Sequence, residues 1–73
     1  MNASMRHHLS VLDRTIVHLL NERARLVAGA TSDAEFVTAH FDDLARRSAG
    51  PFPSEALKDT FAAIDRGCEE VPS

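Results

Sequence analysis

The chain contains one cysteine, three glycines, three prolines and neither tryptophan nor tyrosine in 73 residues. A single cysteine, Cys68, rules out an intramolecular disulfide framework and a zinc site built from several cysteines. Because four phenylalanines are the only aromatic residues, a surface that stacks nucleic-acid bases is disfavoured. The formal net charge of −3 argues against binding to a phosphate backbone by bulk electrostatics. We therefore expect no nucleic-acid partner.

Long apolar runs are also missing, so the sequence predicts no membrane-spanning segment. The chain does not open with the pattern of a signal peptide, and a cytoplasmic protein is the default expectation. A chain of 73 residues holds at most one core, so we predict a single domain over residues 1–73. A core this small supplies only roughly 3–5 kcal/mol, so the fold needs a partner chain or tight helix packing.

The positions of glycine and proline divide the chain into three helices and leave no sustained strand-like alternation. We predict an all-α fold with helices over residues 4–29, 33–48 and 53–69, with the first helix fading near Gly29. The first helix carries an apolar stripe at three- and four-residue steps, formed by Leu9, Leu12, Ile16, Leu19, Leu20, Leu26 and Val27.

Local signals support the second helix. Ser32 to Glu35 fits a capping box that begins at the Ser32 hydroxyl. Asp42 with Arg46, and Asp43 with Arg47, are i,i+4 pairs of favourable order. The helix should end before Gly50-Pro51, which is a strong stop signal.

The third helix should begin with Pro53 in its first turn, where a missing N–H costs nothing. Its apolar edge follows steps of four, three and four residues through Leu57, Phe61, Ile64 and Cys68. The Cys68 thiol is therefore expected to be packed rather than reactive.

Four histidines raise the question of a metal site, but their spacing does not favour one. His7 and His8 are adjacent and point about 100° apart on a helix. His18 and His40 have no recognised ligand spacing, and His18 with Glu22 fits a surface pair equally well. Phosphate-binding loops and a strand-to-helix nucleophile turn are absent as well. We expect no metal and no cofactor.

Arg23 lies at a core-facing step of the apolar stripe, where a charge must snorkel, pair or bind an anion. One interpretation is a pair with Glu22 or with an acid on another helix. The other is an arginine that lines a cavity and binds a small carboxylate through its planar fork. Arg6 lies about 25 Å away along the same helix. A second, antiparallel chain would bring Arg6 close to Arg23.

These residues resemble a known family, the all-helical chorismate mutases. The resemblance is carried by Leu12-Asp13, Ile16, the stretch Leu19–Leu26 with its Glu22-Arg23, and Gly50–Pro53 followed by Glu55-Ala56-Leu57. It implies an intertwined homodimer of three-helix chains that isomerises chorismate to prephenate. It also implies that Arg23 binds a substrate carboxylate and that Arg6 reaches the site from the partner chain.

The sequence departs from the family's catalytic pattern at several positions. The family's lysine to the breaking ether oxygen falls at Asp33 or Ala34 here. The substrate-holding residues that open its second helix fall near Val37 to His40. Its third-helix serine falls at Cys68, and the glutamine or glutamate four residues later falls at Pro72.

The expected function follows from this loss. The rearrangement is unimolecular, so its catalysis comes from holding the substrate and from donors to the developing oxyanion. We therefore expect a protein that binds chorismate or a related dicarboxylate with weak or no isomerase activity. One alternative is an active mutase in which Arg46, Arg47 or Lys58 supplies a relocated cation. The other is a non-catalytic helical module that interacts with or regulates a partner protein.

Overall fold

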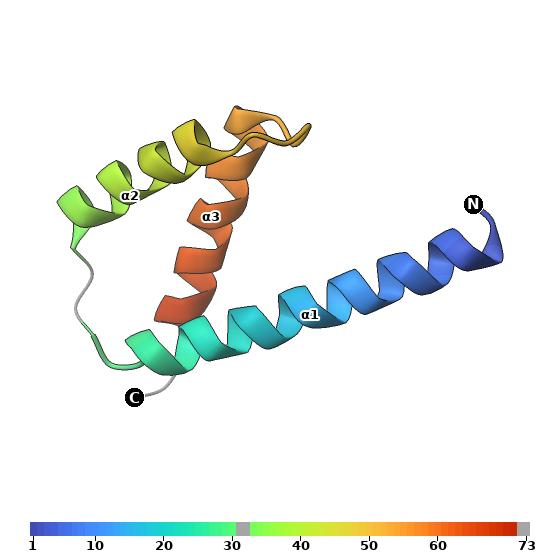
Figure 1. Ribbon diagram of the computed structural model, residues 1–73. Coiled ribbons are helices and arrows are strands. Elements are labelled where there is room, and N and C mark those ends of the chain that lie inside the picture. The colour runs from blue at the N-terminus through green and yellow to red at the C-terminus, as the bar shows by residue number, and fades with distance from the viewer. Residues whose placement is uncertain (31–32, 72–73) are drawn as a thin grey trace.

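The structure is a computed structural model that describes residues 1–30 and 33–71, and every element in those ranges is a helix. Helix α1 spans Ala3–Val27, α2 spans Ala34–Arg47 and α3 spans Ser54–Glu69 (Figure 1). The predicted all-α class is confirmed, and each predicted boundary lies within two residues of the observed one. None of the described helices has the long, weakly charged apolar stretch needed to cross a bilayer.

Helix α1 is bounded by local signals at both ends. The Asn2 side chain accepts a hydrogen bond from the Met5 backbone N–H at 2.8 Å. Past the last turn, Gly29 adopts a φ of 77°, in the left-handed region that glycine enters without a steric penalty. The chain therefore turns away after Val27, as the weak helix propensity near Gly29 predicted.

Two helix starts differ in detail from the sequence prediction. Asp33 is the N-cap of α2, and its carboxylate accepts a hydrogen bond from the Phe36 backbone N–H at 3.1 Å. Ser32, which was expected to cap this helix, lies outside the described residues. Pro53, expected within the first turn of α3, precedes that turn at the N-cap position.

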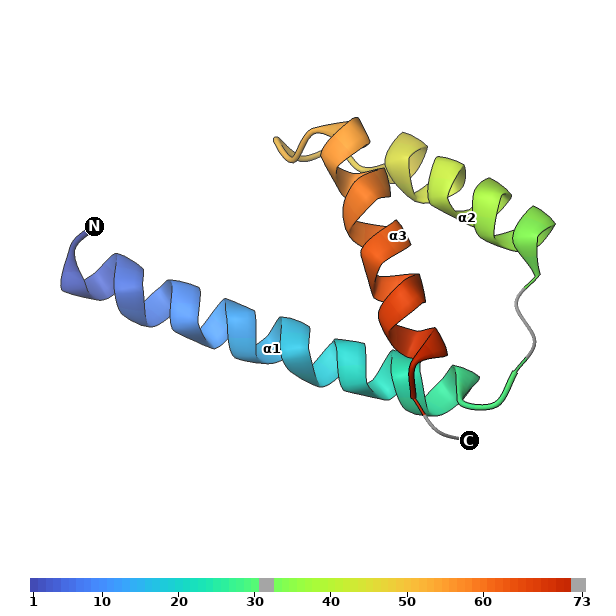
Figure 2. The ribbon, with the colours of Figure 1, turned by 180° about the vertical axis from the view of Figure 1, so that it is seen from behind.

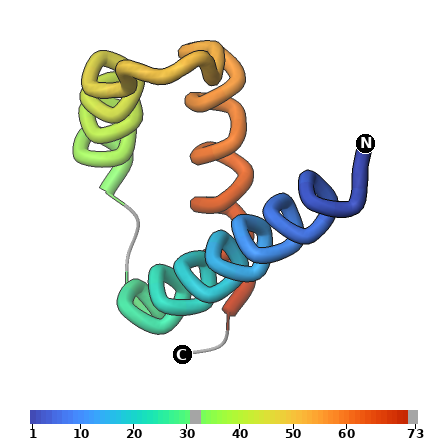
Figure 3. Tube along the Cα trace, turned by 45° about the vertical axis from the view of Figure 1, so that its right-hand side comes forward, coloured from blue at the N-terminus to red at the C-terminus, as the bar shows by residue number. Residues whose placement is uncertain are grey.

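Helix α3 holds the fold together because it packs against both other helices. It crosses the C-terminal part of α1 and runs beside α2, whereas α1 and α2 make no contact with each other in the described ranges (Figures 2 and 3). The rings of Phe41 and Phe61 meet with centroids 6.0 Å apart between α2 and α3. The predicted edge of α3 faces these neighbours, with Leu57 and Ile64 half-buried and Cys68 buried.

The core is very small. Among the described residues, only Ala45 and Cys68 are buried. Every residue of α1 from position 3 to position 19 is exposed, and this part of the helix projects beyond the rest of the chain (Figure 1). Along one face of it runs a row of apolar side chains, the exposed stripe, which are 44–59% accessible: Met5, Leu9, Leu12, Ile16 and Leu19.

The capping role of Asp33 gives a first prediction. Asp33→Ala removes the acceptor for an otherwise unsatisfied helix N–H, so the free energy of unfolding should fall by about 1 kcal/mol. The measurement is urea denaturation at fixed protein concentration. Asp59→Ala is the control, because it removes the same charge from an exposed site inside α3. Equal stability of the Asp33 variant and the wild type would show that the cap contributes nothing.

Candidate functional site

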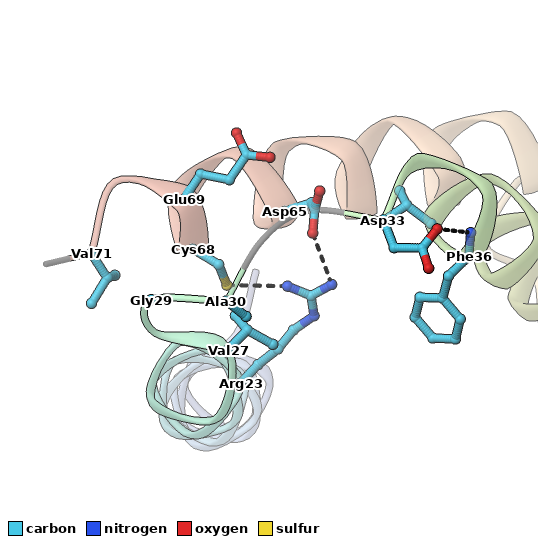
Figure 4. A pocket seen from close by; sticks show the side chains of 11 residues that line it. Arg23, Val27, Gly29, Ala30, Asp33, Phe36, Asp65, Cys68, Glu69 and Val71 are labelled. Carbon is cyan, nitrogen blue, oxygen red and sulfur yellow. Dashed lines mark hydrogen bonds and ion pairs between the residues drawn. The ribbon is translucent and has the colours of Figure 1, made fainter. Parts of the chain in front are cut away.

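A cavity of about 430 Å³ opens where the end of α1, the start of α2 and the end of α3 come together (Figure 4). Its walls combine charged groups with apolar side chains. The residues that line it are Arg23, Val27, Gly29, Ala30, Asp33, Phe36, Val37, Asp65, Cys68, Glu69 and Val71. Its volume suits a small organic ligand.

Arg23 extends from α1 across this cavity toward α3. Its Nη2 atom lies 3.3 Å from Oδ1 of Asp65, and its Nη1 atom donates to Sγ of Cys68 at 3.1 Å. The Arg23 and Asp65 side chains are 25% and 23% exposed, so the pair is largely dehydrated. The sequence left open an ion pair with an acid on another helix, and the structure contains that pair.

The other acid considered for Arg23 has a different partner. Glu22 pairs with Arg25 one turn along α1. The hydrogen bond from Arg25, followed by the positive charge of Arg25, lowers the pKa of the Glu22 carboxyl below its ordinary value. Glu22 therefore takes no part in holding Arg23.

Asp65 was not singled out in the sequence, although a signal for it exists. It follows Phe61 by four residues and precedes Cys68 by three, which is the spacing of a helix face. A carboxylate on that face, in a chain with an arginine on the stripe of another helix, marks a candidate ion pair. The register between α1 and α3, which the sequence does not provide, is what joins Asp65 to Arg23.

Negative charge dominates the lining of the cavity. Arg23 is its one cation among the described residues, whereas three acidic residues line it, namely Asp33, Asp65 and Glu69. The Asp33 carboxylate is directed to the backbone of α2, and Glu69 points away from the guanidinium (Figure 4). A dianionic ligand thus finds one positive group here, already paired with Asp65.

The other predicted cations lie at the opposite end of α3. Lys58 pairs with Asp42 at 3.2 Å. Ten residues, or about 15 Å along the helix axis, separate Lys58 from Cys68. A second hollow of about 650 Å³ lies at this end and is lined by Arg46 and Lys58, among others. One chain therefore does not bring Lys58 or Arg46 to Arg23.

The pairing expected within α2 is correct for one pair and wrong for the other. Arg47 contacts Asp43 at 2.7 Å, as predicted. Arg46 also turns to Asp43, at 3.4 Å, instead of to Asp42. Asp42 is drawn away because Lys58 of α3 lies beside it, a neighbour that the order of the chain does not reveal.

Arg6 lies on the projecting part of α1, far from Arg23 of the same chain, and is exposed. Among residues 1–30 and 33–71, no group of histidine, cysteine and carboxylate side chains is arranged to hold a metal ion. The ring of His40 stacks on Phe36 with centroids 5.2 Å apart, so it belongs to the surface packing of α2.

Comparison with protein-family models, with curated proteins and with solved structures found no match to this chain. The chorismate mutase family therefore stays a prediction made from the residues themselves. Function has to be argued from the cavity, the exposed stripe and the charges around Arg23.

The two arginines near Asp43 give a prediction about its titration. The hydrogen bond from Arg47 is the main cause that lowers the pKa of the Asp43 carboxyl, with smaller contributions from the charges of Arg47 and Arg46. Arg47→Gln should therefore raise this pKa toward its ordinary value, and Arg46→Gln should raise it less. The measurement is an NMR titration of the Asp43 side chain in both variants.

The lowered pKa of Asp43 determines how the free energy of unfolding changes with pH. A carboxyl whose pKa is lower in the folded state stabilises the fold above its unfolded pKa and loses that contribution as pH falls through its folded pKa. In Arg47→Gln, the free energy of unfolding should therefore fall less as the pH is lowered. An unchanged Asp43 titration in Arg47→Gln would contradict the assignment.

Proposed function

We propose that this chain is a divergent, chorismate-mutase-like helical protein that pairs as a homodimer and binds chorismate or a related dicarboxylate, with weak or absent isomerase activity. One observation carries the proposal. Arg23 continues the line of the exposed stripe, four residues after Leu19, and its guanidinium enters an open cavity. The same face of α1 therefore presents both a surface for another helix and a group that binds carboxylates.

The exposed stripe supports the homodimer. Five large apolar side chains at alternating four- and three-residue steps lie uncovered on one helix. Patches of this kind on a small protein mark interaction surfaces. A second copy offers an identical stripe, and two such helices packed side by side bury both of them.

An antiparallel arrangement of the two α1 helices also supports a shared site. Arg6 and Arg23 are 17 residues apart, or about 25 Å along α1. With the helices antiparallel, Arg6 of one chain approaches Arg23 of the other. The cavity would then contain a second cation, which a dicarboxylate requires.

The charges around the cavity favour binding over catalysis. The reaction needs a donor at the ether oxygen, where negative charge develops, and loss of such a donor costs about 10²–10³ in rate. In the place that the resemblance assigns to this donor, Asp33 contributes a carboxylate to the cavity wall. Two arginines alone hold the ground and transition states about equally, which does not raise the rate of the chemical step.

Two alternatives remain distinguishable from this proposal. An active mutase would need Arg46, Arg47 or Lys58, each now paired with a carboxylate on α2 or α3, to act in a cavity formed with another chain. A non-catalytic module for protein interaction is favoured by the uncovered stripe itself. Rapid consumption of chorismate would support the first alternative, and dimerisation without chorismate binding would support the second.

The proposed carboxylate-binding role of Arg23 is tested by Arg23→Ala. The variant should keep its helical content and lose detectable chorismate binding in calorimetry. Arg25→Ala is the control, since Arg25 carries the same charge on α1 but pairs with the exposed Glu22 instead of with a residue of the cavity. Wild-type turnover, followed by the loss of chorismate absorbance, should be absent or slow. If Arg23→Ala unfolds and the wild type binds no chorismate, Arg23 is a structural ion-pair member instead.

The proposed dimer is tested by Ile16→Glu, which places a charge in the middle of the exposed stripe. Loss of an isoleucine that the proposed dimer would bury should cost about 1.5–3 kcal/mol per chain and weaken association at least tenfold. Sedimentation equilibrium measures the effect. The matched control is Asn21→Glu, which adds the same charge about 140° around the helix. A monomeric wild type with intact helices would contradict the dimer.

A further inference from the structure

Asp65 takes up the groups of Arg23 that a ligand carboxylate would use. A guanidinium binds a carboxylate most strongly through two parallel N–H donors. In this chain Nη2 of Arg23 faces the Asp65 carboxylate at 3.3 Å, and Nη1 faces the sulfur of Cys68 at 3.1 Å. Figure 4 shows both contacts on the cavity side of α3. One N–H of each terminal nitrogen is therefore engaged before any ligand arrives.

Partial burial strengthens the contact between Asp65 and Arg23. About three quarters of each side chain of the pair is shielded from water, because Arg23 and Asp65 are 25% and 23% exposed. Charges interact more strongly in such surroundings than on an open surface. A second carboxylate that enters the cavity must displace Asp65 or lie beside it, and both arrangements are unfavourable.

The remaining carboxylates of the lining do not have this effect. The Asp33 carboxylate caps α2 through the Phe36 N–H, and Glu69 makes no contact with Arg23. Both add negative charge to the surroundings, but neither occupies the fork. Asp65 and Glu69 thus provide two acids on one helix that line one cavity, of which the half-buried Asp65 contacts Arg23 and the exposed Glu69 does not.

We propose that Asp65 is a specificity-determining residue of the Arg23 cavity, an internal carboxylate that competes with a ligand carboxylate for the guanidinium and so lowers the affinity for dianionic ligands. This inference rests on the proposed function, because it concerns the same carboxylate-binding arginine. It implies that a dicarboxylate binds this cavity more weakly than it would bind an unpaired arginine. It also predicts that the weakness lies in one residue and is reversible.

The experiment compares chorismate binding by the wild type, Asp65→Asn and Glu69→Gln in calorimetry. Asp65→Asn keeps the shape of the side chain and removes its charge, so the affinity should rise roughly tenfold, or about 1.4 kcal/mol. Glu69→Gln removes the same charge from the same cavity without releasing Arg23, so its effect should be much smaller. Circular dichroism and sedimentation verify that the variants retain the wild-type helical content and assembly.

A second variant tests the proposed role of Asp65 if Asp65→Asn does not fold. Asp65→Leu continues the apolar edge of α3, offers nothing to the guanidinium and should tighten chorismate binding in the same way. Unchanged or weaker binding in the folded variants would overturn the proposal, as would equal gains from Asp65→Asn and Glu69→Gln. If both Asp65 variants fail to fold, the pair is structural and the proposal is wrong.

These outcomes separate this inference from the proposed function. If the wild type binds chorismate and Asp65→Asn binds no tighter, the inference alone fails. If only the Asp65 variants bind, the wild-type chain is not a dicarboxylate binder, and Asp65 is the reason. Absence of binding in all variants contradicts both statements.

Discussion

The exposed stripe of α1 is the constraint on which the rest of this structure depends. A helix this long remains folded in water chiefly through packing of its apolar face, and positions 3–19 have no packing partner among residues 1–30 and 33–71 of their own chain. With only Ala45 and Cys68 buried among the described residues, the chain gains little hydrophobic stabilisation by itself. The proposed homodimer supplies the missing cover without any further element.

The stripe also connects packing to chemistry. Arg23 follows the exposed stripe on the same face of α1, at the point where α1 meets α3 and the cavity opens. A charge at that step must be compensated, and Asp65 compensates it within the chain. A ligand carboxylate would be an alternative partner for the same guanidinium. The competition between an internal and an external carboxylate is therefore the electrostatic feature that decides what the cavity can bind.

The helices were predictable because their signals are local. Gly29, Gly50-Pro51 and the three- and four-residue apolar steps lie within a turn or two of the boundaries that they set. The charge partners on other helices were not predictable. Asp65 with Arg23 and Asp42 with Lys58 depend on how α3 lies against its neighbours. Spacing along one helix led to the expectation of an Asp42–Arg46 pair, which contact with α3 overrides.

The most direct test of this account is isotope-filtered nuclear Overhauser spectroscopy on a mixture of labelled and unlabelled wild-type chains. This measurement detects only contacts between different copies. We predict intermolecular contacts among the Leu9, Leu12 and Ile16 side chains, together with contacts that place Arg6 of one chain near Arg23 of the other. Absence of every intermolecular contact along α1, in a chain that retains its three helices, would contradict it.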